Sequence, residues 1–375
     1  MRIEFFLLLV AFVLVAGSCD RRVDSADSET IGIPVQLKGP GRVTGISLYD
    51  IVEHPQTIVV DPPQPMTQIY QLKYVRGRYY MTDSRRRNIL VFDDDGRILL
   101  NLSRRGRAEY EYVSMECFDV NPANGEISIY DIDRRRMVVY SEDGQYARSF
   151  DLAKGVRVFQ DFAVREDGSY LIYVSHGTPG SSNPRGLIEL DRNGNLSRVM
   201  ASLDDDFQLI LNYMPYVNFH RLSDGTLTVH GQQDKNEIYH IDRAGVLSIP
   251  YQIAYDVTWS EAMRKMTEPF EEPDYYDIVQ YFETDHWLGM FVRYQEKHSV
   301  LVYYNKETGE CYTGKTEKGK ITFQDVLPYE KGDLPYYQFS AGDRLMFPDN
   351  PSAYKEDAAD NKIYVKVYME KGLPE

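Results

Sequence analysis

Cysteine and net positive charge are both scarce in this sequence. The 375 residues include only 3 Cys, and 42 Lys and Arg stand against 57 Asp and Glu, which gives a net charge of −15. Proteins that hold nucleic acid through its phosphates need a basic footprint, so nucleic acid is excluded as a main partner. The sequence also lacks a G-x-S-x-G motif, a Walker motif and a Cys–His nucleophile signature, so it contains no complete catalytic constellation.

The N-terminus has the pattern of a targeting segment. Phe5–Ala16 is an uninterrupted apolar run of 12 residues, too short to cross a bilayer as a helix. Small residues then lead into Cys19 in the order Ala16-Gly17-Ser18-Cys19, which resembles a bacterial lipobox. We therefore expect a signal peptide over 1–18 and a lipid on Cys19. The alternative is an ordinary secretory signal cleaved near Cys19; in both cases the mature chain lies outside the cytoplasm.

The rest of the chain is organised by a recurring phrase of two apolar strands and a Gly-containing turn. Tyr79–Gly96 and Ile127–Gly144 show it most clearly, and four looser copies follow. The turn glycines are 48, 50, 51, 64 and 63 residues apart, and they are Gly96, Gly144, Gly194, Gly245, Gly309 and Gly372. A period of about 40–50 residues with several strands per unit is typical of β-propeller blades. The repeat predicts an all-β, six-bladed propeller with four-stranded antiparallel blades.

The turn signals also predict individual strands and domain boundaries. In the second blade we expect strands at 115–120, 126–131, 136–140 and 145–150, separated by Asn-Gly and Asp-Gly turns. Residues 19–33 are polar and aperiodic and are predicted to be a flexible tether, with the propeller over 34–375. Strands before the first full blade are expected to complete the last blade and close the ring. A short helical insertion is expected at 258–270.

The propeller also sets the state of the two remaining cysteines. Cys117 falls in a strand that begins a blade and Cys311 in a strand that ends one. Inner and outer strands are farther apart than the roughly 7 Å that a disulfide can bridge. Both residues are therefore predicted to be buried free thiols.

Local motifs add a family resemblance. The segment 92–96 reads Phe-Asp-Asp-Asp-Gly, and 106–112 partly follows the pattern G-x-G-P-x-E-Y, with Ala108 and Glu109 in place of the Gly-Pro pair. These features resemble the six-bladed propeller lipoproteins common in Bacteroidetes, which are related to NHL-repeat propellers. The resemblance covers roughly Val43 to Tyr368. It implies the fold and a position at the cell envelope, with the outer membrane as the expected membrane, rather than a mechanism.

The strands that open each blade should line the central channel. Strand alternation turns one polar position per blade toward it, and these positions are Gln71, Cys117, Asp161, Asn218, Gln280 and Gln338. A ring of amides and carboxylates could bind a polar small molecule or a cation. It could equally hold ordered water.

Arginine clusters form a second candidate site. They follow Asp83 and Asp131 in matching turns and consist of Arg85, Arg86, Arg87, Arg134, Arg135 and Arg136. A basic patch between the first two blades could hold an anionic ligand such as an acidic glycan or a carboxylate. The alternative is Arg–Asp pairing between blades, with the two Asp residues bonding nearby backbone.

Histidines and loop aromatics are weaker signals. The seven histidines have no metal-ligand spacing, so no metal cofactor is predicted, and calcium or zinc remains the alternative. Aromatic residues that fall in connections could stack on sugars or grip a peptide, or could pack between blades. They are Tyr110, Tyr112, Tyr213, Tyr216, Trp259, Tyr275, Tyr276, Tyr336 and Tyr337.

These observations favour a non-catalytic binding module that holds a glycan, a peptide or a protein partner, with the membrane reached through the lipid on Cys19. A competing hypothesis is a metal-dependent lyase or lactonase-like enzyme with its site in the channel. A third is a structural subunit of an outer-membrane assembly.

Overall fold

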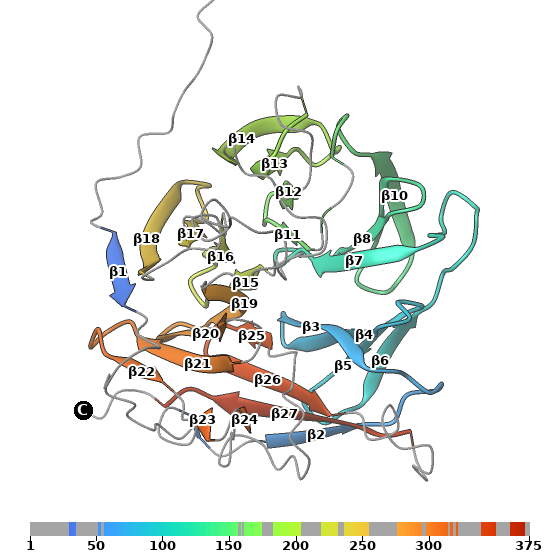
Figure 1. The fold of residues 1–375 in the computed structure, drawn as a ribbon. Helices are drawn as coiled ribbons and strands as arrows, with labels where there is room; N and C mark the ends of the chain where they lie inside the picture. The colour runs from blue at the N-terminus through green and yellow to red at the C-terminus, as the bar shows by residue number, and fades with distance from the viewer. Residues whose placement is uncertain are drawn as a thin grey trace, which may run out of the picture.

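The computed structural model describes the chain in segments. These are residues 30–34, 52–53, 56–156, 159, 161–174, 183–203, 219–231, 236–254, 276–294, 298–313, 316–317, 320–321, 339–349 and 361–371. Strands are the regular elements of these segments, and they form blades around a central axis (Figure 1). No helix of the described part is long and apolar enough to cross a membrane. The expected insertion at 258–270 lies outside the described residues.

The first three blades are separate four-stranded antiparallel sheets. Blade 1 contains β3 (Ile69–Val75), β4 (Arg78–Asp83), β5 (Ile89–Phe92) and β6 (Ile98–Leu102). Blade 2 contains β7 (Met115–Val120), β8 (Ile127–Asp131), β9 (Arg136–Tyr140) and β10 (Tyr146–Asp151). Blade 3 contains β11 (Phe162–Val164), β12 (Tyr170–Val174), β13 (Gly186–Leu190) and β14 (Leu196–Ser202). The strands predicted for blade 2 are confirmed to within one residue at each end.

The last three blades complete the ring. Blade 4 contains β15 (His220–Arg221), β16 (Leu227–His230), β17 (Glu237–Ile241) and β18 (Leu247–Ala254). Blade 5 contains β19 (Tyr276–Glu283), β20 (Trp287–Tyr294), β21 (His298–Asn305) and β22 (Cys311–Thr313), and a small hairpin of β23 (Thr316–Glu317) and β24 (Lys320–Ile321) follows. Blade 6 contains β25 (Phe339–Ala341), β26 (Arg344–Asp349), β27 (Ile363–Met369) and β2 (Gln56–Val60). The six-bladed propeller predicted from the repeat is therefore the observed fold.

Two N-terminal strands close and extend this ring. β2 pairs antiparallel with β27, so an early segment supplies the outer strand of the last blade, as predicted. β1 (Ile31–Pro34) instead pairs parallel with β18 and adds an outer strand to blade 4. Residues 31–33, expected to belong to a flexible tether, thus form part of the sheet. The difference arises because Ile33 is fully buried between blades 4 and 5.

Apolar side chains pack between neighbouring blades and form the core. The interface of blades 1 and 2 contains Tyr80, Phe118 and Tyr140, each fully buried. Cys117 packs between blades 2 and 3 as a buried free thiol, while Cys311 is a half-buried free thiol at the edge of a cluster. The turn glycines serve close approaches: Gly96 has φ of 77°, and a Cβ there would lie 2.1 Å from the carbonyl oxygen of Val59.

Candidate functional site

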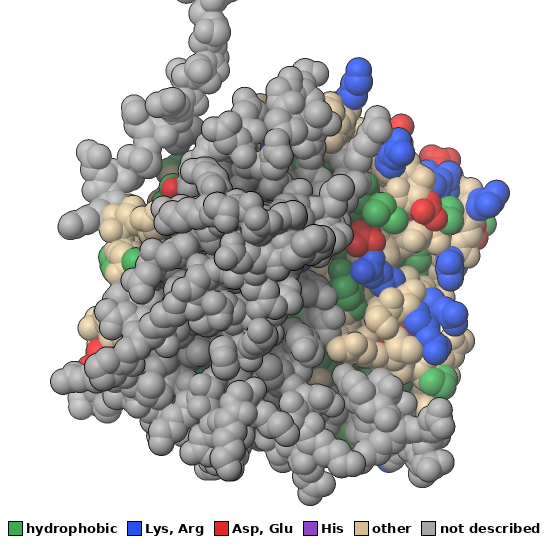
Figure 2. Space-filling view, in the orientation of Figure 1, with side chains coloured by type: hydrophobic (Ala, Val, Ile, Leu, Met, Phe, Trp, Pro, Cys, Tyr) green, Lys and Arg blue, Asp and Glu red, His purple; other side chains and the backbone are tan. Residues whose placement is uncertain are grey.

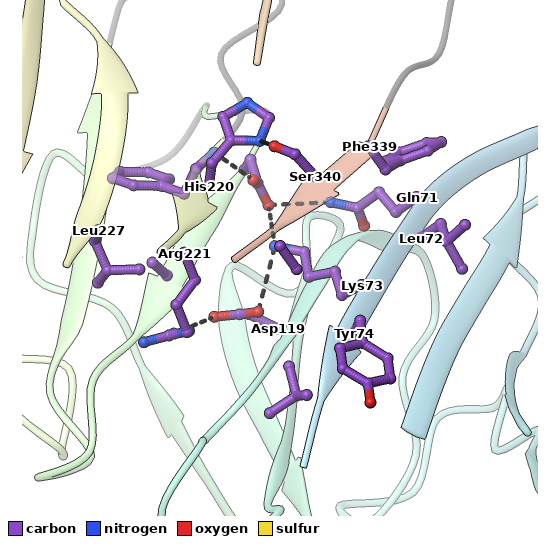
Figure 3. Close-up of a pocket in the computed structure, with 15 residues that line it drawn as sticks. Gln71, Leu72, Lys73, Tyr74, Asp119, His220, Arg221, Leu227, Phe339 and Ser340 are labelled. Atoms are coloured by element: carbon purple, nitrogen blue, oxygen red, sulfur yellow. Dashed lines mark hydrogen bonds and ion pairs between the residues drawn. The ribbon is translucent and has the colours of Figure 1, made fainter. Parts of the chain in front are cut away.

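A cavity lies among the inner strands at the centre of the ring (Figure 3). Blades 1, 2, 3, 4 and 6 contribute to its lining. The volume open to the centres of water molecules is about 50 Å³. One water needs about 10–15 Å³ by this measure, so the cavity has room for a few waters or a small polar group. Its polar lining consists of Gln71, Lys73, Asp119, Asp161, His220, Arg221 and Ser340.

Lys73 is at the centre of this lining. Its Nζ lies 3.0 Å from Oδ1 of Asp161 and 3.3 Å from Oδ1 of Asp119, so one ammonium bridges two carboxylates from different blades (Figure 3). Burial disfavours the charged amine, but the two carboxylates outweigh it and raise the pKa of Lys73. The pKa of Asp161 is also raised, chiefly because its carboxylate is buried. Arg221 adds a second cation, with Nη2 3.6 Å from Oδ2 of Asp119.

The same side chains bond the backbone of the next blade. Oε1 of Gln71 accepts the N–H of Phe118 at 3.1 Å. Oδ2 of Asp119 accepts the N–H of Val164 at 2.7 Å. Oδ2 of Asp161 accepts the N–H of Phe219 at 3.0 Å. Each polar side chain therefore satisfies a buried donor on the next inner strand in sequence, where no sheet ladder does so.

His220 and Ser340 form the wall toward blades 5 and 6. Nε2 of His220 lies 2.9 Å from the carbonyl oxygen of Tyr281, and Nδ1 lies 2.7 Å from Oγ of Ser340. A carbonyl can only accept, so the ring donates from Nε2. Burial lowers the pKa of His220 to about 4, which keeps it neutral near pH 7. The neutral ring brings no charge to the cavity, and the Ser340 hydroxyl, which donates to the carbonyl oxygen of Glu283 at 2.8 Å, lies against Nδ1.

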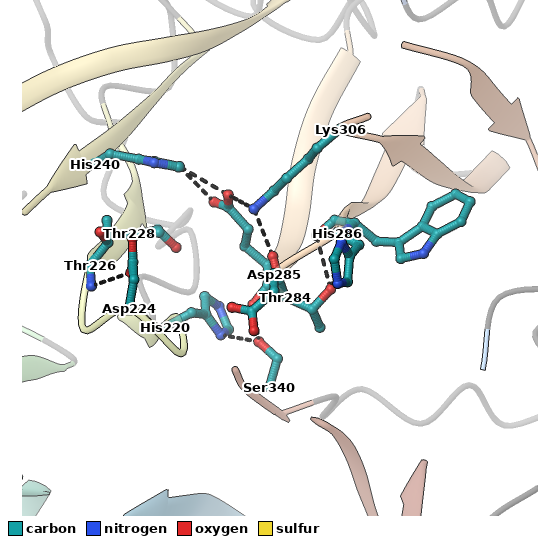
Figure 4. Close-up of polar contacts among 12 residues, drawn as sticks. His220, Asp224, Thr226, Thr228, His240, Thr284, Asp285, His286, Lys306 and Ser340 are labelled. Atoms are coloured by element: carbon teal, nitrogen blue, oxygen red, sulfur yellow. Dashed lines mark hydrogen bonds and ion pairs between the residues drawn. The ribbon is translucent and has the colours of Figure 1, made fainter. Parts of the chain in front are cut away.

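A second buried network lies behind this wall (Figure 4). Glu283 is fully buried, and its carboxylate is bonded by Nε2 of His240 at 2.9 Å and by Nζ of Lys306 at 2.5 Å. The Tyr281 hydroxyl also donates to Glu283 and lies 2.9 Å from Oγ1 of Thr228. Burial alone would raise the pKa of Glu283, but its bonds to His240 and Lys306 lower it to about 2. This network joins blades 4 and 5.

The predicted channel ring is only partly visible. Gln71 and Asp161 line the cavity and bond each other, with Nε2 of Gln71 3.0 Å from Oδ1 of Asp161. Cys117 packs between blades instead, which corrects its assignment to the ring; its apolar thiol is buried against Tyr130 and Phe162. Asn218 and Gln338 lie outside the described residues, as does the side chain of Gln280 in β19.

Sequence reasoning missed five polar lining residues, namely Lys73, Asp119, His220, Arg221 and Ser340. Lys73 and Asp119 each stand two positions after a predicted ring position on the same strand, so strand alternation could have found them. A charged residue within an apolar strand was the available signal. His220 and Ser340 likewise stand two positions after the predicted ring positions Asn218 and Gln338, whereas Arg221 does not, so its place in the lining depends on which blades meet.

The arginines of the predicted basic patch have varied surroundings. Arg86 forms an ion pair with Glu116 and stacks over Tyr70, with Cζ 4.0 Å from the ring centroid. Arg134 donates to the carbonyl oxygens of Arg107 and Ala108 at 3.1 and 2.9 Å. Figure 2 shows Lys and Arg interspersed with Asp and Glu on the visible part of this face, not a continuous basic surface.

The remaining patch arginines divide between buried and exposed. Arg136 is buried and donates to the carbonyl oxygens of Glu109 and Glu111 at 2.8 and 2.9 Å, which holds the loop before β7. Arg85, Arg87 and Arg135 are exposed. The donors of Arg136 are therefore used in hydrogen bonds that stabilise the fold.

The acidic residues before these turns bond backbone, as expected. Asp83 accepts the N–H groups of Thr67, Arg85 and Arg86. Asp131 accepts those of Val113, Ser114 and Arg134. Each carboxylate joins a turn to the chain that enters the blade.

The histidines and the loop aromatics do not form a site among the described residues. That part of the chain contains no group of three or more His, Cys, Asp and Glu placed to hold a metal. Tyr110 is 50% exposed, but Tyr112 is fully buried and donates to the carbonyl oxygen of Arg87 at 2.6 Å. Tyr112 therefore follows the alternative expected for these aromatics, which is packing between blades. The other loop aromatics lie outside the described residues, or their side chains do.

Comparison with known proteins assigns the chain to a family. A family model described as a domain of unknown function, DUF4934, matches residues 66–370. The chain belongs to this family. No curated protein matches it. The match spans the first inner strand through the end of β27, so the whole cavity lies within the family domain.

Solved structures confirm the architecture of this DUF4934 chain. A "Putative exported protein" from Bacteroides fragilis aligns over 91% of this chain and 100% of its own, with a TM-score of 0.68 and 14% identity. A DUF4221 family member from Bacteroides vulgatus aligns over 86% of this chain and 98% of its own, with a TM-score of 0.55 and 11% identity. At these identities the likeness shows the fold alone. A gluconolactonase from Xanthomonas campestris reaches a TM-score of only 0.46, which carries no argument.

Proposed function

We propose that this protein is an extracytoplasmic, lipid-anchored propeller that binds a ligand at its central cavity and performs no chemistry on it. The observation that carries the proposal is the cavity itself, a polar space at the ring centre where Lys73 and Arg221 are only partly engaged. Concave sites with a few convergent polar groups are the usual form of ligand sites. The ligand class is a glycan, a peptide or a protein segment that inserts a small group.

The arrangement of charges favours binding over metal-assisted catalysis. The Lys73 ammonium occupies the position between Asp119 and Asp161 that a cation would take. Both carboxylates also accept backbone N–H groups, so a metal would have to displace Lys73 and compete with the fold. A lyase or lactonase-like reaction at this place therefore has less support.

The location rests on two independent features. The sequence Ala16-Gly17-Ser18-Cys19 has the order of a lipobox. The structurally similar protein from Bacteroides fragilis carries the description "Putative exported protein". Together they support export and anchoring through Cys19, with the propeller outside the cytoplasm.

Thermal unfolding of the full-length chain in mild detergent tests the binding function. Glycans, peptides and divalent ions are added singly, with and without EDTA. A ligand at 100 times its dissociation constant should stabilise the fold by about 2.7 kcal/mol, and EDTA should have no effect. A fall in melting temperature with EDTA would contradict a metal-free binding module and favour the enzyme.

A variant that fills the cavity tests whether the stabilisation by ligand arises from binding there. Ala341→Leu places extra volume in the cavity lining and should remove the stabilisation by ligand. Ala123→Leu adds the same volume at an exposed turn and should leave it intact. Loss of the ligand response in both variants would argue against the cavity as the site.

A further inference from the structure

The acceptor atoms of the central cavity are already engaged. Oδ1 of Asp161 accepts from Gln71 and Lys73, and Oδ2 accepts from Phe219. Oδ1 of Asp119 faces Lys73, and Oδ2 accepts from Val164. An amine or a metal ion would have to compete with Gln71, Lys73 and backbone N–H groups for these carboxylate oxygens.

The donor atoms of the cavity are not used up. An ammonium has three N–H donors, and Lys73 directs two of them at the two carboxylates. A guanidinium has five, and the hydrogen bond of Arg221 within the described residues is from Nη2 to the carbonyl oxygen of Val164 at 2.7 Å. Lys73 contacts Oδ1 of Asp119 and Arg221 contacts Oδ2, and both side chains line the cavity. The cavity therefore offers donors of Lys73 and Arg221 that the lining leaves unused.

We propose that this cavity binds a carboxylate group, held by the third N–H of Lys73 and the guanidinium of Arg221. This inference rests on the proposed binding function and specifies its ligand class. Charge-assisted hydrogen bonds of this kind are about twice as strong as neutral ones. The space of about 50 Å³ suits a carboxylate head group. Phe219, Leu227 and Phe339 in the lining would contact the body of the ligand.

The charge of the lining limits how much negative charge a ligand can bring. The cavity lining holds two cations and two carboxylates, and His220 is neutral. One added negative charge can be shared by Lys73 and Arg221. A phosphate dianion would place two further charges beside Asp119 and Asp161 in a partly buried site, and burying unbalanced charge is costly. The cavity should therefore prefer carboxylates to phosphate.

Paired ligands of equal shape test the proposal. Calorimetric titration of the full-length chain compares glucuronate with glucuronamide and acetate with acetamide, with inorganic phosphate as a further probe. We expect each carboxylate to bind at least tenfold more tightly than its amide. Equal or tighter binding of the amides, or of phosphate, would overturn the ligand class and leave the binding function standing. If no compound binds at the cavity while another ligand stabilises the fold, the carboxylate site is likewise overturned.

Substitution of Arg221 tests whether this residue causes the preference for carboxylate over amide. Arg221→Gln keeps a donor and removes the charge, and it should weaken carboxylate binding at least tenfold while amide binding stays the same. Arg97→Gln is the matched control, because Arg97 is 77% exposed in a turn of blade 1. Arg221→Lys retains the charge and should retain the preference for carboxylate over amide. Unchanged carboxylate affinity in a folded Arg221→Gln protein would overturn the proposal.

Discussion

Single polar side chains connect the inner strands of successive blades. Gln71, Asp119 and Asp161 each accept a backbone N–H from the next blade while facing the cavity. Inner strands of neighbouring blades diverge, so buried backbone donors there need side-chain partners. The residues that shape the candidate site are therefore also residues that hold the ring, and a variant that removes one of them tests both roles at once. Arg221 is the better probe because it is partly exposed.

The pKa values of two buried carboxyl groups are shifted in opposite directions. Glu283 is bonded by His240 and Lys306, and its pKa falls to about 2. Glu370 is buried with weaker compensation, and its pKa rises to about 8. Burial is the largest influence on Glu370, aided by the nearby carboxylates of Asp285 and Asp343. Its carboxyl group is bonded by the Thr284 hydroxyl and, at 3.2 Å, by the N–H of His286.

The raised pKa of Glu370 predicts a specific pH dependence of stability. Its pKa is higher in the folded state than in the unfolded chain, so the folded state binds the proton more tightly. That contribution is fully present below about pH 4.5 and is lost as pH rises toward 8. Glu370→Gln resembles the protonated acid and cannot ionise. Between pH 5 and 8 its melting temperature should fall less than that of the wild type, and parallel curves would show that Glu370 does not titrate in this range.

At the scale of elements, the N-terminal segment adds one strand to each of two blades that are not adjacent in the ring. β2 completes blade 6 through an antiparallel pairing, while β1 extends blade 4 through a parallel pairing. β1 is short, but Ile33 is fully buried with Tyr251, Met290 and Val302 between blades 4 and 5. β1 therefore seals an interface between blades in addition to extending a sheet.

Two substitutions in β1 measure this sealing contribution. Ile33→Ala removes a fully buried side chain and should lower the free energy of unfolding by about 2–4 kcal/mol. Ile31→Ala changes a side chain that is 43% exposed on the same strand and should cost no more than about 0.5 kcal/mol. Urea unfolding followed by tryptophan fluorescence gives both values. Equal effects would mean that β1 does not pack stably on blade 4.

On the scale of the whole molecule, the ring departs from six-fold symmetry. β15 of blade 4 pairs in parallel with β25 of blade 6 through Arg221 and Ala341, so the two blades belong to one nine-stranded sheet. This bridge brings Arg221 and Ser340 to the same cavity as Lys73. The site thus depends on a long-range contact between blades that are not neighbours in sequence.

The proposed anchor would also orient the molecule. Eleven residues separate Cys19 from Ile31, and an extended chain of that length spans at most about 40 Å. Because Ile31 begins β1, the outer edge of blade 4 should stay within that distance of the membrane.

Replacing the proposed lipidation site tests the anchor. Cys19→Ser should move the protein from the membrane fraction to the soluble envelope fraction with an unchanged melting temperature, because Cys19 precedes the propeller in sequence. Gly17→Ala, which keeps a small residue before the cysteine, is the control and should remain with the membrane. Membrane association of Cys19→Ser would contradict lipid anchoring at this position.

Local sequence determined the blades. Strand alternation and turn glycines act over a few residues, so the strands of blade 2, the repeat of blades and the closing role of an early strand could be predicted. The same alternation pointed Gln71 and Asp161 toward the centre. Tertiary structure decided the remainder. Cys117 packs between blades and β1 pairs with blade 4. Lys73 contacts Asp119 and Asp161, and Arg221 contacts Asp119, only because the ring closes. Contacts between distant blades depend on closure geometry, which no local pattern encodes.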